Sequence, residues 1–267
     1  MGQNRADTVI RNCGISGSIK IKGPGSGAGL VGHNMGEIEN CYNLADVTLE
    51  TEILEGAVIA GISNTTTGPI YRCFNAGNLE FIANDLSTLQ STIIDIGGIS
   101  SYSQNAIQEC YNLGSIYTKI LANEERETHI RVGGICGNAE STISNCYNRG
   151  KIEVNSSKAT LYIGGIRGTG TNANENYVEN CYNIGDIKFN CEEDLYTGGV
   201  SGVNGNIANC YYLNQSDYTN AESGVIKTES EMKEDSFVEQ LNEKNQMTIW
   251  KKDTLQINNG YPIFIWQ

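Results

Sequence analysis

Cysteine is the residue of this chain whose chemistry and spacing first invite a function. Seven of the nine cysteines recur at intervals of 28, 32, 37, 36, 35 and 29 residues. Such a set could bind a metal, form disulfides or fill a narrow interior. No C-x-x-C pair and no histidine or aspartate at ligand spacing accompanies it, so a metal site is disfavoured. The recurring cysteines, named here the cysteine ladder, are Cys13, Cys41, Cys73, Cys110, Cys146, Cys181 and Cys210.

Disulfide pairing within this ladder conflicts with the spacing of β-strands. Equivalent residues of stacked strands place their Cβ atoms about 4.8 Å apart, which exceeds the ~3.5–4.5 Å that a disulfide favours. We therefore expect free, buried thiols that act as small apolar filler. Cys136 and Cys191 fall outside the repeat and are the two exceptions to test.

An aromatic residue follows six of the seven cysteines and gives the chain its most conspicuous predicted surface feature. A row of outward aromatic rings could stack on sugar rings or receive the apolar groups of a partner. The same rings could instead stack on one another and cover a corner of the fold. These residues, named here the aromatic ladder, are Tyr42, Phe74, Tyr111, Tyr147, Tyr182 and Tyr211.

Catalytic chemistry finds little support in the sequence. Glycan-active enzymes need carboxylates clustered across neighbouring strands, and neither the column five residues after the cysteines nor the one two residues before them concentrates acids. No acidic loop has a calcium-binding pattern, and no Lys-Ser/Thr pair follows the Gly-Gly motifs. We therefore predict no catalytic residue, no metal and no cofactor.

The residues around each cysteine predict extended strands. A β-branched aliphatic residue stands three positions before every cysteine of the ladder, from Ile10 to Ile207. Apolar or small residues then follow at every second position, which is the strand period. A Gly-Gly or similar block precedes the cysteine, and length varies mainly between the strand and the next block, so variable loops should project at one corner.

A unit this small cannot bury its own apolar face and must stack on its neighbours. We predict a mainly β protein, a right-handed parallel β-helix (β-solenoid) of about seven coils, over residues 1–215. The hand is taken from the usual crossover rule. Each coil should hold two or three short strands, with the cysteines facing inward and the aromatic residues outward. The asparagine two residues after the cysteine should lie at a bend and form a ladder that satisfies backbone and amide groups.

Residues 216–267 have a different pattern and predict a small α/β cap. Thr228 and Glu231 have the spacing of a capping box, and Met232, Phe237, Val238 and Leu241 could form one apolar stripe of a helix. The segments "MTIW", "LQI" and "IFIW" are typical of short strands. Because the last coil of a solenoid exposes unpaired backbone, we expect the cap to cover that open end.

Charge and hydropathy limit the partners. The formal net charge is −13 and no basic run is present, so nucleic acid and anionic membrane surfaces are disfavoured. No stretch of about 20 apolar residues could cross a bilayer.

The stretches "GLVGHNMGEIENCYNLADV" and "GGICGNAESTISNCYNRGKI" resemble the GLUG-motif repeats of bacterial surface and secreted proteins. That resemblance implies an extracellular or cell-surface location, flanking domains of a larger polypeptide and a host or cell-surface glycan or protein as partner. Such repeats also accompany IgA-specific metallopeptidase domains, whose His-Glu-x-x-His site is absent here, since His33 and His129 are followed by Asn34 and Ile130. The expected function is a non-catalytic spacer or adhesion module. A carbohydrate-binding module that uses the aromatic ladder is the alternative, and a β-helical glycan-active enzyme is less favoured.

Overall fold

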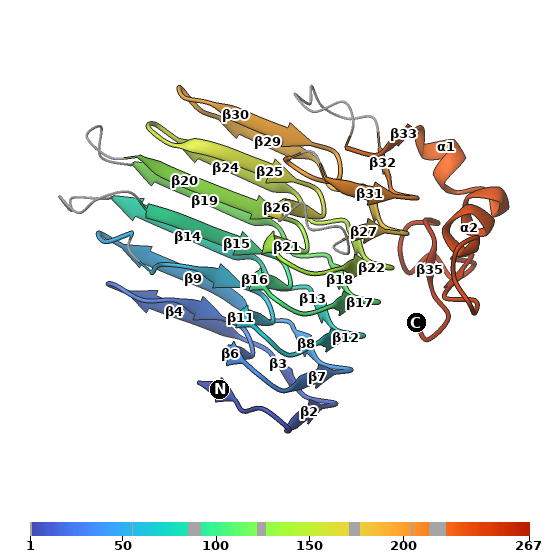
Figure 1. The fold of residues 1–267 in the computed structure, drawn as a ribbon, viewed down its shortest axis with the longest axis horizontal. Coiled ribbons are helices and arrows are strands. Elements are labelled where there is room, and N and C mark those ends of the chain that lie inside the picture. Colours follow the sequence, from blue (N-terminus) through green and yellow to red (C-terminus); the bar gives the residue numbers. More distant parts are fainter. Residues whose placement is uncertain are drawn as a thin grey trace.

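The chain winds into a parallel β-solenoid, as the repeat predicts (Figure 1). A computed structural model describes residues 2–54, 56–84, 92–121, 127–170, 177–203, 205–213 and 223–267. Each coil contributes one strand to each of five sheets, named A to E in the order in which the chain meets them. Within the described residues, five complete coils run from Gly27 to Asn190, with a partial coil before and after them.

Sheets A, B and C enclose one end of each coil. Sheet A holds β1 (Gln3–Asn4), β6 (Val31–Asn34), β11 (Ser63–Thr66), β16 (Ser100–Ser103), β21 (Cys136–Ala139) and β26 (Arg167–Gly170). Sheet B holds β2 (Val9–Arg11), β7 (Glu37–Glu39), β12 (Ile70–Tyr71), β17 (Ile107–Gln108), β22 (Ile143–Ser144), β27 (Tyr177–Glu179) and β31 (Asn206–Ala208). Sheet C holds β3 (Gly14–Ile15), β8 (Tyr42–Asn43), β13 (Phe74–Asn75), β18 (Tyr111–Asn112), β23 (Tyr147–Asn148), β28 (Tyr182–Asn183), β32 (Tyr211–Leu213) and β33 (Val225–Lys227).

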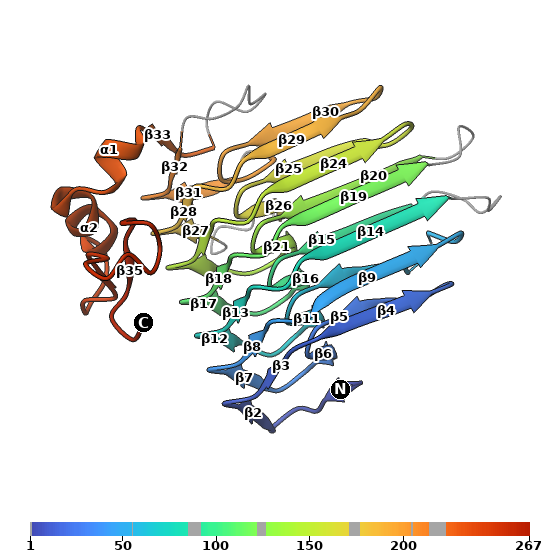
Figure 2. The same ribbon diagram turned by 180° about the vertical axis from the view of Figure 1, so that it is seen from behind.

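Sheets D and E have most of the longer strands and form a flat blade. Sheet D holds β4 (Ser18–Lys22), β9 (Asp46–Thr51), β14 (Leu79–Asn84), β19 (Ile116–Leu121), β24 (Ile152–Ser156) and β29 (Ile187–Asn190). Sheet E holds β5 (Gly27–Ala28), β10 (Ile59–Ala60), β15 (Thr92–Gly97), β20 (Thr128–Gly133), β25 (Thr160–Gly164) and β30 (Leu195–Gly198). Figure 2 shows the long strands pointing away from the C-terminal helices.

Two apolar cores fill these compartments. The core inside sheets A, B and C contains the aliphatic column of sheet B and the buried cysteines. The core between sheets D and E contains alternate residues of the long strands, such as Val47 and Leu49 of β9. The connections from sheet D to sheet E range from three residues between β24 and β25 to seven between β9 and β10, so the predicted loop corner is confirmed.

The number of strands per coil was predicted wrongly. Five short strands replace the expected two or three because bends in the chain interrupt the hydrogen-bonded ladders. One bend uses a residue with positive φ before each ladder cysteine, such as Asn145 at 50°. Another follows the Gly-Gly block between sheets E and A, where a Cβ on Gly98 would lie 2.0 Å from the carbonyl oxygen of Gly134.

The C-terminal segment contains α1 (Glu229–Met232), α2 (Asp235–Asn242) and the antiparallel pair β34 (Trp250–Lys251) and β35 (Ile263–Phe264). The capping box of Thr228 and Glu231 is present. "LQI" forms a turn rather than the expected strand. The expected boundary between residues 215 and 216 lies outside the described residues, and no described helix is long and apolar enough to cross a membrane.

The position of this segment agrees with the prediction only in part. Its first described residues, 223–227, cover the edge of the last coil, because β33 pairs with β32 and Oγ of Ser223 accepts from the N–H groups of Val200 and Ser201. The elements that follow, α1, α2 and β35, lie along the side of the solenoid, next to sheet C (Figures 1 and 2). The physical reason is the apolar stripe that sheet C presents on its outer side. Burying the rings of several coils removes more apolar surface from water than covering one coil edge.

Candidate functional site

Each repeat places a residue in the left-handed conformation directly before its ladder cysteine. The residue before every ladder cysteine has a φ between 50° and 55°, a region in which asparagine is enriched among non-glycine residues. Five of the seven are asparagine, and the exceptions are Arg72 and Glu109. Their side chains form an ion pair with Arg72 Nε 2.9 Å from Glu109 Oε2. The seven residues are Asn12, Asn40, Arg72, Glu109, Asn145, Asn180 and Asn209.

The cysteine ladder faces inward, as predicted. Its members are buried except for Cys13, which is exposed on the first partial coil. The left-handed bend points the N–H of a ladder cysteine toward the neighbouring coil, where the thiol of the next ladder cysteine lies. The N–H of Cys41 donates to Sγ of Cys73 at 3.4 Å, and the N–H of Cys146 donates to Sγ of Cys181 at 3.3 Å. The ladder therefore supplies acceptors for backbone groups that no strand partner satisfies.

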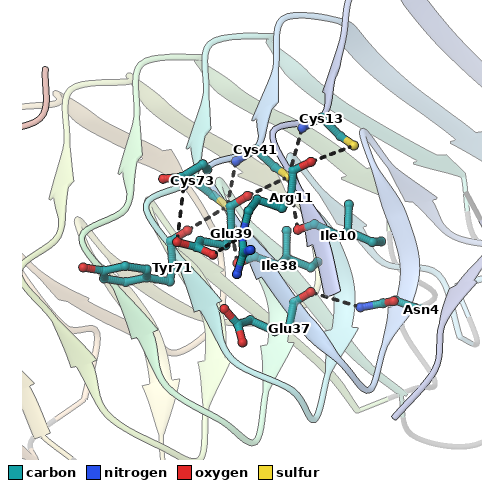
Figure 3. Close-up of polar contacts among 11 residues, drawn as sticks. Asn4, Ile10, Arg11, Cys13, Glu37, Ile38, Glu39, Cys41, Tyr71 and Cys73 are labelled. Carbon is teal, nitrogen blue, oxygen red and sulfur yellow. Dashed lines mark hydrogen bonds and ion pairs between the residues drawn. The ribbon is translucent and has the colours of Figure 1, made fainter. Parts of the chain in front are cut away.

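Figure 3 shows this arrangement in the first coils. The thiol of Cys41 also donates to the carbonyl oxygen of Glu39 at 3.2 Å, while the carboxylate of Glu39 accepts from Arg11 Nε at 2.5 Å. All nine cysteines are free thiols. Burial raises the pKa of the Cys136 thiol, inside sheet A, and of the half-buried Cys191 thiol. Thiols of this kind are poor nucleophiles and favour a structural role.

The asparagine ladder is confirmed. Nδ2 of Asn43 donates to Oδ1 of Asn75 at 2.7 Å, and the same contact recurs up the solenoid to Asn183. Each Nδ2 also donates to the carbonyl oxygen two residues further along its own chain, such as Gly150 for Asn148 at 3.0 Å. The buried amides therefore supply hydrogen-bond partners to one another and to backbone carbonyl groups at the bend into sheet D.

The aromatic ladder lies on the outer side of sheet C, and its rings from Tyr42 to Tyr182 stack face to face, whereas Tyr211 makes an edge contact with Phe237. Ring centroids are 5.4 Å apart for Tyr42 and Phe74, 4.9 Å for Phe74 and Tyr111, 4.8 Å for Tyr111 and Tyr147, and 5.1 Å for Tyr147 and Tyr182. The interplanar angles do not exceed 14°. Because neighbouring rings cover each other's faces, mainly ring edges remain for any partner.

The expected exposure of this ladder is wrong for four of its six members. Tyr111, Tyr147, Tyr182 and Tyr211 are at most 8% exposed, whereas Tyr42 is 38% exposed. The C-terminal segment covers them and joins them in a third apolar cluster. The sequence places outward side chains correctly but does not reveal which other segment of the chain will pack on them.

Polar contacts fix the C-terminal segment to the ladder. The hydroxyl of Tyr182 donates to the carbonyl oxygen of Pro262 at 2.5 Å, and Trp250 Nε1 donates to Oδ1 of Asn145 at 3.0 Å. Trp266 Nε1 donates to Oε2 of Glu109 at 3.0 Å. The left-handed column before the cysteines thus also anchors this segment. These contacts join residues that are 80 to 157 positions apart, so no local sequence pattern predicts them.

Sequence reasoning missed a second ladder, on the outer side of sheet E. Asp95, Arg131, Tyr162 and Tyr196 are all two residues before a Gly-Gly pair and lie in one column. Aligning the chain on that pair would have shown it. Arg131 Nε and Nη2 donate to the two oxygens of Asp95 at 2.5 and 2.8 Å. The rings of Tyr162 and Tyr196 stack at 4.9 Å.

Two residues of this second ladder, Arg131 and Tyr162, line one wall of a polar groove with a volume of about 360 Å³, together with Ile93 and His129. The opposite wall comes from sheet A and the bend after it, and includes Asn138, Glu140 and Thr169. Asn138 is 6% exposed and its Oδ1 accepts from the hydroxyl of Thr169 at 3.1 Å. The groove offers donors, acceptors and the rings of His129 and Tyr162. Arg131 in its wall is already paired with Asp95, which lies behind the lining.

A second cleft, of about 580 Å³, separates sheet B from the C-terminal segment. Its walls include Glu37, Tyr71 and Glu109 on one side and Met247 on the other. Glu109 accepts from the Tyr71 hydroxyl, Arg72 and Trp266, which is the pattern of a structural carboxylate. Among the described residues, no group of three or more His, Cys, Asp or Glu side chains could hold a metal ion.

Comparison with known proteins agrees with this architecture. A crystal structure of a candidate immunoglobulin A1 protease from Bacteroides ovatus superimposes with a TM-score of 0.60. It has 22% sequence identity, and the match covers 93% of this chain and 75% of that one. No curated protein matches the sequence. The model of the GLUG motif matches residues 23–48 and 128–153, each of which runs through sheets E, A, B and C into the start of sheet D. The chain thus carries GLUG-motif repeats, and one matched motif builds one coil.

Proposed function

We propose that this repeat module is a rigid, non-catalytic spacer in a bacterial extracellular or cell-surface protein. The observation that carries the proposal is the continuity of the ladders: cysteine thiols, asparagine amides and aromatic rings each connect successive coils along one axis. A body of this kind resists bending because any tilt between coils breaks all three ladders together. The extracellular setting is supported by the GLUG motif and by the candidate protease that shares the fold.

Rigidity can be measured directly. We would place the intact chain between two fluorescent domains and record energy transfer at the single-molecule level, with an equally long Gly/Ser linker as the control. A spacer is expected to give one narrow distance distribution that does not change with salt or viscosity. A broad distribution like that of the linker would contradict the proposal.

A catalytic role has its own test. The buried carboxylates in or next to the two clefts already have partners, Arg131 for Asp95 and the Tyr71, Arg72 and Trp266 donors for Glu109. We therefore expect no hydrolytic or lyase activity on a broad glycan panel. Robust turnover that a single acidic substitution abolishes would show that the module is an enzyme.

Adhesion is the second candidate, and the sheet E groove favours it over the aromatic ladder. The rings of both surfaces are stacked on neighbours, at 4.8–5.4 Å in sheet C and at 4.9 Å for Tyr162 and Tyr196. The groove in addition offers the polar side chains of Arg131, Asn138 and Thr169, which could bind sugar hydroxyl groups. A glycan array with Arg131→Ala and Tyr162→Ala, beside Tyr42→Ala as a matched control, separates the two surfaces. Loss of binding only in the first two variants would support the groove, and loss only in the control would support the ladder. Absence of hits for the unmodified chain would argue against adhesion to glycans.

A further inference from the structure

One arginine lies inside the solenoid at a position where the other coils have uncharged residues. Arg167, at the start of β26, is 0% exposed. A lone charge in an apolar interior is strongly unfavourable unless an opposite charge or hydrogen bonds compensate it. Packing alone therefore does not account for this departure from the repeat. The column reads Val31, Ser63, Ser100, Cys136, Arg167 and Ser201.

The guanidinium of Arg167 has more donors than acceptors around it. Nε donates to Oγ of Ser201 at 3.2 Å. Nη1 and Nη2 are buried and meet no hydrogen-bond acceptor among the described residues. Gly170 lies against this group, since a Cβ there would be 2.6 Å from Nη1. Burial lowers the pKa of Arg167, but arginine remains protonated at neutral pH.

Two other arginines of the solenoid show how this protein normally neutralises such a charge. Arg131 bonds both oxygens of Asp95, and Arg72 bonds Glu109. The remaining buried carboxylate of the described residues, Asp253, accepts from three backbone N–H groups of the turn that follows it. Among the described residues, no buried carboxylate is therefore left for Arg167.

The nearby thiols do not supply the missing charge either. Cys136 and Cys210 are close enough to Arg167 to interact with it electrostatically. Burial nevertheless raises the pKa of both thiols, so that they remain neutral at physiological pH. Within the part of the chain that the structure describes, no group therefore supplies the compensating negative charge.

We propose that Arg167 binds a small monovalent anion, with chloride as the physiological occupant, inside the compartment enclosed by sheets A, B and C. One guanidinium neutralises one negative charge, so a divalent oxyanion would leave excess charge buried. A halide also needs no fixed acceptor geometry and can receive hydrogen bonds from both Nη groups. The site joins β26 to the partial coil that follows, through Ser201.

Bromide provides a direct probe. Crystals of the intact chain would be soaked in sodium bromide and measured at the bromine absorption edge. We expect an anomalous peak within hydrogen-bonding distance of Nη1 and Nη2. The proposal fails if no peak lies there, or if oxygen atoms of the chain itself occupy both Nη groups.

Stability provides an independent test. Thermal unfolding would be compared in sodium chloride and in sodium gluconate, whose anion is too large to be buried, at equal ionic strength. Chloride is expected to raise the midpoint by about 3 °C. Arg167→Ser, which restores a residue that this column holds in three other coils, should abolish the difference. Arg131→Met, which removes an arginine that has its own carboxylate, should retain it. An equal difference in Arg167→Ser, or none in the unmodified chain, would refute the proposal.

Discussion

The bend between sheets B and C and the blade formed by sheets D and E obey different rules. At the bend, residue identity repeats: a left-handed residue, a cysteine, an aromatic ring and an asparagine recur in coil after coil. In the blade only the alternation of apolar and polar residues repeats, and the equivalent position holds Leu49, Phe81, Thr118 or Val154. The connections from D to E also differ in length.

This difference shows what demands a particular residue. At the bend, buried polar groups must find specific partners in the adjacent coil, and few side chains have the required geometry. In the blade, strand hydrogen bonds already satisfy the backbone, so that any apolar side chain of suitable volume fills the core. The comparison is tested by substitutions on the two sides, of which the asparagine ladder should give the largest effect.

Asn148→Ala should destabilise the protein by about 4 kcal/mol. The substitution removes the hydrogen bonds that Asn148 makes with Asn112 Nδ2, Asn183 Oδ1 and the backbone of Gly150, so each of these buried groups loses one partner. In the blade, Ile152→Val should cost about 1 kcal/mol because it removes only one methylene group. Chemical denaturation of both variants measures the two values. Equal losses in the free energy of unfolding would contradict the difference between bend and blade.

The sequence predicted the contacts at the bend better than it predicted the position of the C-terminal segment. The columns of Cys73 and Asn75 follow from local periodicity, because the repeat itself brings equivalent residues together. The C-terminal segment has no repeat partner, so nothing in the pattern indicated that Trp250 would contact Tyr147 and Tyr182. Likewise, the sequence predicted that the aromatic ladder faces outward, but it did not predict that the C-terminal segment buries most of it.

Weakening the contact between the C-terminal segment and the aromatic ladder should give the next largest loss of stability. Trp250 is fully buried, and its indole contacts the rings of Tyr147, Tyr182 and Phe264. Trp250→Ala should cost about 3 kcal/mol and release the C-terminal segment while the coils stay folded. Limited proteolysis combined with circular dichroism would detect cleavage after residue 223 without loss of β-structure. Met247→Ala, on a residue that is 67% exposed, is the matched control and should leave the segment protected. Global unfolding instead of local release would mean that the segment is part of the solenoid core.

Alkaline pH should weaken the contact between the C-terminal segment and the aromatic ladder. Burial raises the pKa of Tyr111 to about 12, and it also raises the pKa of Tyr147 and Tyr182 well above the ordinary value of a tyrosine. The unfolded chain loses these protons from about pH 10, whereas the folded protein retains them, so the stabilisation is complete below that pH and is lost as the pH rises above it.

The expected slope is about 1.4 kcal/mol per pH unit for each such tyrosine. Absorbance at the phenolate band, followed with circular dichroism, should show these tyrosines ionising only together with unfolding. Tyr147→Phe should reduce the slope, while Tyr117→Phe, in the blade, should leave it unchanged. Ionisation of all tyrosines before any loss of structure would contradict the buried ladder.

The cysteines give the smallest change in stability and the sharpest contrast between positions. Cys13 is exposed and Cys191 is half-buried, whereas the other seven thiols are buried. A thiol reagent should therefore modify Cys13 rapidly, Cys191 slowly and the rest only after unfolding, because a buried thiol presents neither its thiolate nor an open path to the reagent. Cys13→Ser should change the free energy of unfolding by less than about 0.5 kcal/mol and remove the fast phase alone. Rapid modification of several ladder thiols in the folded protein would show that the coils open locally at the bend, and the bend would then be the weaker of the two regions.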